Sequence, residues 1–246
     1  MNWPLIVILC AGSFPGIFLA MPQLIHFLLR ENTENLQRKI TRIANLQTMT
    51  MVLLMSIAGN VISGITGLNA PILQLILTGD AAIGYLLDFL FPVFLYTVAG
   101  LIFFLILYYG AVASILDEST FKVMNRLRKV IGLAGGTLYG GITEEILARW
   151  GLLNVITFFS ILISGKHTNL VYCLAIFISG FFYSLCQLPA YLAAGCKGSR
   201  RFIYSLVLLY LVQSILFGLL FWRYGIEAAI LSHILFYIGW WTYDHQ

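Results

Sequence analysis

Seven long apolar stretches, separated by short polar segments, dominate the pattern of hydrophobic and polar positions along this chain. The hydrocarbon core of a bilayer is about 30 Å thick, and a helix needs about 20 apolar residues to cross it. The pattern therefore predicts an all-α fold, a polytopic membrane protein built as a bundle of about seven transmembrane helices. The predicted spans are 4–29, 44–69, 81–116, 131–163, 169–188, 202–222 and 226–243.

The third and fourth stretches are too long for one straight helix, so the number of crossings can also be six or eight. The first is interrupted by Pro15 and Gly16, but no basic residue precedes it, so we expect a retained helix and not a cleaved secretory signal. The third contains Asp88 and Pro92, and the fourth contains three charges. No internal repeat and no long linker divides the chain, and we expect one transmembrane domain over residues 1–246.

Composition supports the same class of protein. Of the 246 residues, 60% are hydrophobic and only 10% are charged, and the mean hydropathy is +0.92. A soluble domain carries roughly a quarter charged residues, because its surface must face water. The composition therefore excludes a soluble enzyme and a disordered chain, and it favours an integral protein surrounded by membrane lipids.

The basic residues indicate an orientation in the membrane. Eleven of the 14 Lys and Arg residues fall in the segments 30–43, 117–130 and 189–201, which the seven spans place on one side. Basic loops stay in the cytoplasm, so we expect the N-terminus outside and the C-terminus inside, in a bacterial plasma membrane since no organelle-sorting motif is present. The segments 30–43 and 117–130 are predicted to lie along the inner membrane surface. The net charge of +4 comes from basic residues in short loops, and these do not form a basic patch for nucleic acid. No nucleic-acid partner is therefore expected.

Three charged residues within the fourth stretch are candidates for chemistry: Glu144, Glu145 and Arg149. A charged side chain in hydrocarbon costs about 2.5–3.5 kcal/mol, so it pairs, faces water or has a function. On a helix, Glu145 and Arg149 can form an ion pair across four residues, whereas Glu144 points about 100° away around the axis. We expect Glu144 to face an internal cavity and to act as a general base for water. The alternative is an ion pair that only holds two helices together.

Further polar residues lie within the later apolar stretches. His233 and Tyr237 share a helix face in the last stretch, and Gln187 closely precedes Pro189 in the fifth. Taken alone, an intramembrane His is more often a hydrogen-bonded packing residue than a ligand, and an amide at a helix end more often bonds to backbone carbonyls. Asp88 is a further intramembrane candidate, with no partner that the sequence identifies.

Several catalytic motifs are absent from the chain. It has no HExxH motif, no Gly-x-Ser-x-Gly nucleophile elbow and no glycine-rich phosphate loop. A zinc protease of the HExxH class, a serine hydrolase with that elbow and a nucleotide-binding loop are therefore not expected.

The acidic motif resembles the first motif, EExxxR, of the CPBP family of intramembrane proteases. This family includes the CAAX prenyl endopeptidases and the bacteriocin self-immunity (Abi) proteins. The matching residues here are Glu144, Glu145 and Arg149. Together with the two motifs described next, the resemblance covers about residues 117–243.

The second and third family motifs have partial counterparts. The second is FxxxH, which Leu-Pro often follows. The stretch from Tyr183 to Gln187 is similar to this motif, and here too it is followed by Leu-Pro, ending at Pro189. The third is HxxxN or HxxxD, and it is similar to the stretch from His233 to Tyr237. The order of the three motifs and the spacing between them match the family.

The resemblance implies a role for each matched residue. Glu144 would be the general base, Glu145 with Arg149 would shape the site, and His233 would contribute to the oxyanion hole. Gln187 stands where the family has His, and it cannot act as an acid or base, although its amide can orient a water molecule. Losing a general acid–base group typically costs about 10²–10⁴ in rate.

Tyr237 stands where the family has Asn or Asp. A tyrosine hydroxyl can donate a hydrogen bond to an oxyanion, so we expect this change to be tolerated. The family is often described as metalloproteases, but catalytic zinc usually has three protein ligands. Only Glu144 and His233 are strong ligands at the motif positions. We therefore expect no cofactor, with zinc as the alternative.

These observations predict an intramembrane endopeptidase of the CPBP type, in which water activated by Glu144 attacks a peptide bond near the cytoplasmic face. Its partner would be a peptide or protein substrate in or near the membrane. A catalytically impaired relative acting in immunity or regulation is one alternative, and a transporter or channel is another. A channel predicts a water path across the whole membrane. A protease predicts a cavity open to one side, with Glu144, Gln187 and His233 around it.

Overall fold

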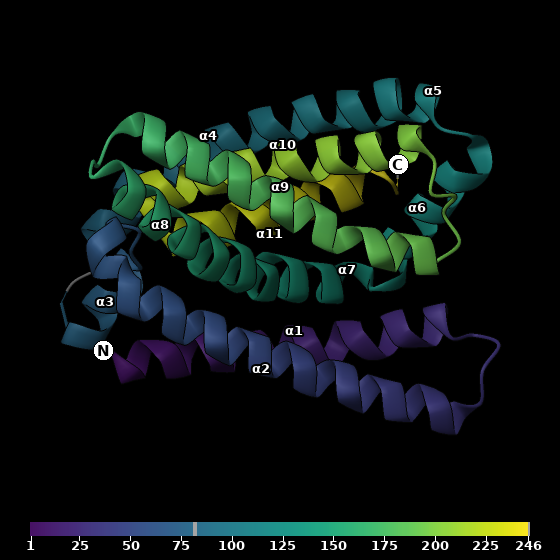
Figure 1. Cartoon of the computed structure of the whole chain (residues 1–246), viewed down its shortest axis with the longest axis horizontal. Helices are drawn as coiled ribbons and strands as arrows, with labels where there is room; N and C mark the ends of the chain where they lie inside the picture. The colour runs from purple at the N-terminus through teal and green to yellow at the C-terminus, as the bar shows by residue number, and fades with distance from the viewer. Residues whose placement is uncertain (81–82, 246) are drawn as a thin grey trace.

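The computed structural model describes residues 1–80 and 83–245, and the regular secondary structure in these residues is entirely helical (Figure 1). In chain order the elements are α1 (Trp3–Leu28), α2 (Glu34–Thr66), α3 (Pro71–Thr78), α4 (Ile83–Leu105), η1 (Ile106–Val112), α5 (Ala113–Ile115), α6 (Glu118–Val130), α7 (Gly132–Gly135), η2 (Gly136–Glu144), η3 (Ile146–Leu153), α8 (Asn154–Ser164), α9 (Asn169–Ala193), α10 (Arg200–Tyr224) and α11 (Ile226–Tyr243). The η elements are π-helical.

Six helical segments are long and apolar enough to cross a membrane, which confirms the prediction of an all-α polytopic membrane protein. They are Trp3–Leu28, Glu34–Thr66, Leu87–Ile115, Gly132–Ser164, Asn169–Ala193 and Arg200–Tyr224. Each overlaps one predicted span. The predicted start of the third span, at residue 81, lies outside the described residues.

The seventh predicted span, 226–243, forms α11, which is not among these six segments. It carries Glu227 and His233, and it packs against η2, α10 and α4. Figure 1 shows α11 between the other helices of the bundle. A helix enclosed by protein needs less apolar surface than one that faces lipid, and this explains the composition of α11.

The predicted interruption of the first span is wrong, because α1 continues through Pro15 and Pro22. Proline is tolerated in transmembrane helices, where neighbouring groups satisfy the freed backbone carbonyls. Gly16 is a contact point instead of a break. A Cβ atom on this residue would collide with the backbone of η2 at Leu138, so the glycine lets the two helices touch.

The two segments predicted at the membrane surface behave differently. The segment 117–130 forms the separate helix α6, whose N-cap is Asp117. The segment 30–43 is not a separate helix, since its residues from Glu34 onward are the first turns of α2, which is 33 residues long. No glycine or proline occurs between Glu34 and Ala58, so nothing in this sequence ends the helix.

The layers of the bundle place the acidic motif at its centre. The α1–α2 hairpin runs along one side, the continuous helix from α7 to α8 lies next to it, and α9, α10 and α4 lie beyond (Figure 1). Helix η2 packs against α1 on one side and α11 on the other, while η3 packs against α2 and α9. A cluster of buried aromatic side chains fills the space around η3 and α11: Phe104, Trp150, Phe217, Phe236 and Trp240.

The three basic segments lie at the same end of the bundle, which we call the basic end. The connection between α1 and α2, the region of α6 and the connection between α9 and α10 meet there (Figure 1). The N-terminus lies at the opposite end, with α3 and the connection between α8 and α9. This arrangement agrees with the expected sorting of the loops, while the direction across the membrane stays a prediction.

Candidate active site

The acidic motif lies in a helix with π-helical turns, η2 and η3. Such turns are rare, and they occur frequently at functional sites. A π turn pairs residues five positions apart. Tyr139 and Glu144 are spaced in this way and line the same cavity. Glu144 therefore faces the cavity from a π-helical segment.

Two glycines bring α11 close to this helix. A Cβ atom on Gly140 would lie 3.2 Å from Nε2 of His233, and one on Gly141 would collide with the side chain of Ile234. The helices therefore approach closely enough for the imidazole ring to reach the acidic motif. Larger residues at either position would push His233 away.

Glu145 holds two partners with one oxygen atom. Nη1 of Arg149 lies 3.1 Å from Oε1 of Glu145, and Nδ1 of His233 lies 2.6 Å from the same oxygen. The contact with Arg149 confirms the ion pair predicted from the four-residue spacing. The side chain of Glu145 is 0% exposed and that of Arg149 is 3% exposed. Removing one partner of a buried pair typically costs about 3–5 kcal/mol, so this cluster fixes the position of His233.

Aromatic rings enclose the same cluster. The ring of Phe217 stacks on that of His233, with centroids 4.5 Å apart and an angle of 18° between the planes. Cζ of Arg149 lies 5.3 Å from the centroid of Phe217 and 5.2 Å from that of Tyr183, so both rings make cation–π contacts with the guanidinium. These contacts restrict the orientation of the imidazole and of the guanidinium.

The contact with Glu145 assigns the two nitrogens of His233 different tasks. A carboxylate accepts hydrogen bonds, so Nδ1 carries a proton and donates it to Glu145. Nε2 points toward Gly140, and Oε2 of Glu144 lies on the same side, 3.9 Å from the position of a Cβ on that glycine. Nε2 is therefore the nitrogen that a substrate can meet.

A cavity of about 550 Å³ brings the predicted residues together. Glu144 from η2, Gln187 from α9 and His233 from α11 all line it, which confirms the prediction that they surround one cavity. The side chain of Glu144 is half-buried, and it forms no ion pair with any described residue. Its carboxylate is thus available to a molecule that enters the cavity.

The cavity occupies the space between the basic end and about the middle of the bundle. Its lining comes from η2 and η3, from α4 and α6, and from these turns of the other helices: 20–24 of α1, 47–55 of α2, 183–191 of α9, 206–213 of α10 and 233–240 of α11. Toward the opposite end, buried apolar side chains such as Leu9, Leu153 and Phe221 fill the interior.

Gln187 and Tyr183 stand one turn apart on α9, and both line the cavity. The amide of Gln187 can donate and accept hydrogen bonds but does not titrate. The hydroxyl of Tyr183 is buried beside the carboxylate of Glu144, and it makes no short hydrogen bond to another described residue. This pair supplies polar groups opposite Glu144, without a second imidazole.

Tyr237 lines the cavity, but its hydroxyl is already engaged. It donates to the backbone carbonyls of Arg128 and Gly132, each at 3.3 Å. A hydroxyl has one proton, so in this arrangement Tyr237 does not donate to an oxyanion beside His233, contrary to the expectation from its motif position. It ties α11 to the junction between α6 and α7 instead.

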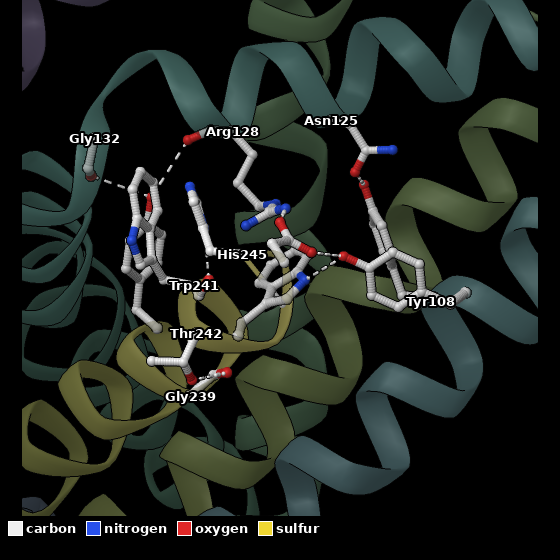
Figure 2. A network of polar contacts seen from close by, with 12 residues as sticks. Tyr108, Asn125, Arg128, Gly132, Gly239, Trp241, Thr242 and His245 are labelled. Carbon is white, nitrogen blue, oxygen red and sulfur yellow. Dashed lines mark hydrogen bonds and ion pairs between the residues drawn. The ribbon is translucent and has the colours of Figure 1, made fainter.

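A second charged cluster, which the sequence analysis missed, lies at the basic end of the cavity (Figure 2). Arg128 forms an ion pair with Asp244, and its guanidinium lies 4.0 Å from the ring centroid of Trp240. Tyr109 donates a hydrogen bond to Asp244 and accepts one from the indole of Trp240 at 3.1 Å. One signal was present in the sequence. Arg128 shares the buried face of amphipathic α6 with Met124, although it was counted as a loop charge.

Two other carboxylates within the apolar stretches lie away from the cavity lining. Oε1 of Glu227 accepts a hydrogen bond from the backbone N–H of Leu73 at 2.8 Å and so caps α3. Asp88 is exposed on α4. Neither belongs to the candidate site.

The donor set does not fit a catalytic zinc ion. Glu145 is held by Arg149 and by Nδ1 of His233, which leaves Glu144 and Nε2 of His233 as the ligands that face the cavity. Catalytic zinc usually has three protein ligands. Within residues 1–80 and 83–245, no group of three or more His, Cys, Asp or Glu side chains is placed to hold a metal ion.

Comparison with known proteins gives a family match for part of the chain. Residues 126–238 match the family described as type II CAAX prenyl endopeptidase Rce1-like. The matched range contains all three motif regions, from Glu144 to Tyr237. No curated protein and no solved structure gives a significant match. Residues 126–238 are thus similar to CAAX-type intramembrane proteases, in agreement with the resemblance of the three motifs to the CPBP family.

Proposed function

We propose that this protein is an intramembrane endopeptidase that hydrolyses a peptide bond at the cavity, and that the basic end faces the cytoplasm of a bacterial cell. The supporting observation is that Glu144, Gln187 and His233, from three different helices, line one cavity in a chain that is similar to this protease family. The family description points to a C-terminal Cys-a-a-X peptide with a prenyl group as the substrate to try first.

The reaction follows from the orientation of the groups. Glu144 takes a proton from water, and the resulting hydroxide attacks the carbonyl carbon of the peptide bond. Nε2 of His233 contacts the developing oxyanion, while the carboxylate of Glu145 holds Nδ1 and so fixes the orientation of the ring. When the C–N bond breaks, Glu144 passes its proton to the leaving amine. The amide of Gln187 orients the water molecule or the carbonyl group.

The position of the cavity favours a protease over a channel. Its lining extends from the basic end to about the middle of the bundle, while apolar side chains such as Leu9 and Phe221 fill the far half. A transporter or channel needs a polar path through both halves. The ion pair of Glu145 and Arg149 also lies beside the cavity and not across a constriction.

Gln187 supports a second candidate, a pseudoprotease that binds peptides without cleaving them. It replaces the His of the second family motif, and loss of an acid–base group typically lowers the rate by about 10²–10⁴. The two candidates share the fold and the cavity. They differ in whether bound peptide is hydrolysed.

Substitution of Glu144 tests the proposed reaction. Purified protein in nanodiscs is incubated with an S-farnesylated Cys-Val-Ile-Ala peptide, and released fragments are measured by mass spectrometry. We expect Glu144→Gln to abolish cleavage, because an amide cannot take the proton from water. Glu227→Gln is the matched control, since Glu227 caps α3 away from the cavity lining. Equal turnover by wild type and Glu144→Gln would eliminate the proposed base, whereas binding without cleavage by wild type would identify a pseudoprotease.

A further inference from the structure

Arg128 is a buried charge that the proposed reaction does not use. Its side chain is 7% exposed, and it lines the same cavity as Glu144 and His233. Nε and Nη1 of its guanidinium are buried and make no short hydrogen bond to a described residue, and the hydroxyl of Tyr108 lies nearby. A buried donor without a partner costs about 1–3 kcal/mol, and a charged one costs more. An acceptor with two oxygens would therefore be stabilised at this position.

Asp244 satisfies this guanidinium only in part. Oδ1 of Asp244 accepts the hydrogen bond from Tyr109, and Oδ2 faces Nη2 of Arg128. Only Oδ2 faces the guanidinium, so Asp244 does not bind Arg128 here in the two-pronged geometry that both groups favour. Asp244 thus neutralises Arg128 but leaves two of its nitrogens to a better-placed anion.

The rise of α11 gives an approximate distance between Arg128 and the reacting groups. The guanidinium lies over Trp240, which follows His233 by seven positions on the same helix. Seven helical residues correspond to two turns and a rise of about 10 Å. An extended peptide rises about 3.3 Å per residue, so about three residues span this distance.

We propose that Arg128 binds the C-terminal carboxylate of the peptide substrate, and that this carboxylate takes the place of Asp244. The inference rests on the proposed endopeptidase function with a Cys-a-a-X substrate, and it adds the residue that binds the free end of that substrate. The peptide bond held between Glu144 and His233 then lies about three residues before the free carboxyl group. The C-terminal carboxylate of a peptide has the two oxygens that a guanidinium binds. A peptide that lies in the cavity along α11 would place this carboxylate at Arg128.

Paired ligands test the charge recognition separately from catalysis. The probes are S-farnesylated Cys-Val-Ile-Ala with a free carboxylate and the same peptide with a C-terminal carboxamide. Their Kd values are measured in the Glu144→Gln background, which prevents cleavage, and in phosphatidylcholine nanodiscs, which exclude anionic headgroups. We expect the carboxylate peptide to bind about tenfold more tightly than the carboxamide.

Two variants connect this preference to Arg128. The double variant Arg128→Gln with Asp244→Asn removes both charges together, so no buried charge is left unpaired. We expect it to bind the two peptides equally, with the affinity for the carboxamide unchanged. Asp244→Asn alone removes the competing carboxylate and should increase the preference for the free acid. The matched control removes an exposed ion pair from the same helix, Glu118→Gln with Lys122→Gln, and should leave the preference as it was.

The proposal fails if the folded double variant keeps the preference for the carboxylate, or if the parent protein binds neither peptide. Should the double variant not fold, an unchanged preference in folded Asp244→Asn overturns it as well. These binding results are independent of the cleavage assay, in which turnover by Glu144→Gln contradicts the proposed function itself.

Discussion

Nδ1 of His233 lies 2.6 Å from Oε1 of Glu145, although the two residues are 88 positions apart in the chain. This contact separates the tasks of two neighbouring carboxylates. Glu145 is fully buried and holds His233 and Arg149, whereas Glu144 faces the cavity. The arrangement is that of an imidazole ring oriented by one carboxylate, with a second carboxylate free to contact water.

Glu145→Gln is expected to lower kcat by about 10²-fold or more, because an amide no longer fixes the proton on Nδ1 of His233. The cleavage assay gives the rate, and nitrogen NMR of labelled histidine reports which ring nitrogen carries the proton. Glu118→Gln, at an exposed position on α6, serves as the control. An unchanged proton position in Glu145→Gln would contradict the orienting role.

Gln187→His is expected to raise the cleavage rate by about tenfold or more, because it restores a titratable group beside Glu144. Gln213→His is the matched control, since Gln213 lines the same cavity from α10. Both variants are compared with wild type at equal amounts of folded protein. An increase with both variants would show that any imidazole in the cavity suffices, and no increase with Gln187→His would remove Gln187 as the cause of a slow rate.

Gly136→Ala is expected to lower the free energy of unfolding by about 1–3 kcal/mol, because the added Cβ collides with the ring of Tyr237. Thermal unfolding in detergent measures the effect. Gly64→Ala is the control, since no atom lies within 4 Å of a Cβ there and alanine favours a helix. The double variant Gly136→Ala with Tyr237→Leu should recover part of the loss. No recovery would argue against the collision as the cause.

The N-cap of α6 is expected to persist well into the acid range. Hydrogen bonds from Ser119 and from the backbone and side chain of Thr120 lower the pKa of Asp117 to about 2. A lowered pKa means that the stabilisation is complete above the unfolded value of about 3.9 and is lost as the pH falls through about 2. Hydrogen exchange of the first α6 amides should therefore accelerate only between about pH 4 and pH 2. Asp117→Ala should exchange rapidly throughout, and a transition above pH 5 would contradict this assignment.

The sequence predicts the parts of this protein that depend on local pattern. Apolar length identified the membrane helices, and a four-residue spacing identified the pair of Glu145 and Arg149. Local rules failed at Pro15, where packing of α1 against η2 maintains the helix.

The remaining features depend on contacts between distant segments. The partner of His233, the engaged hydroxyl of Tyr237 and the burial of Arg128 each require knowledge of which helices are neighbours. Motif comparison placed Tyr237 at the oxyanion, because a motif records residue type and spacing but not where a side chain ends. The convergence of Glu144, Gln187 and His233 was predictable only through the family resemblance, since no pattern within one helix relates them.

The confinement of the cavity to one half of the bundle has a consequence for the cell. Water that reaches Glu144 from the basic end meets closely packed apolar side chains such as Leu153 and Phe221 beyond it. A dissolved ion would lose its hydration shell in that layer, at a cost of many kcal/mol. Such a packed layer preserves the electrical insulation of a membrane beside a chamber that ends within it.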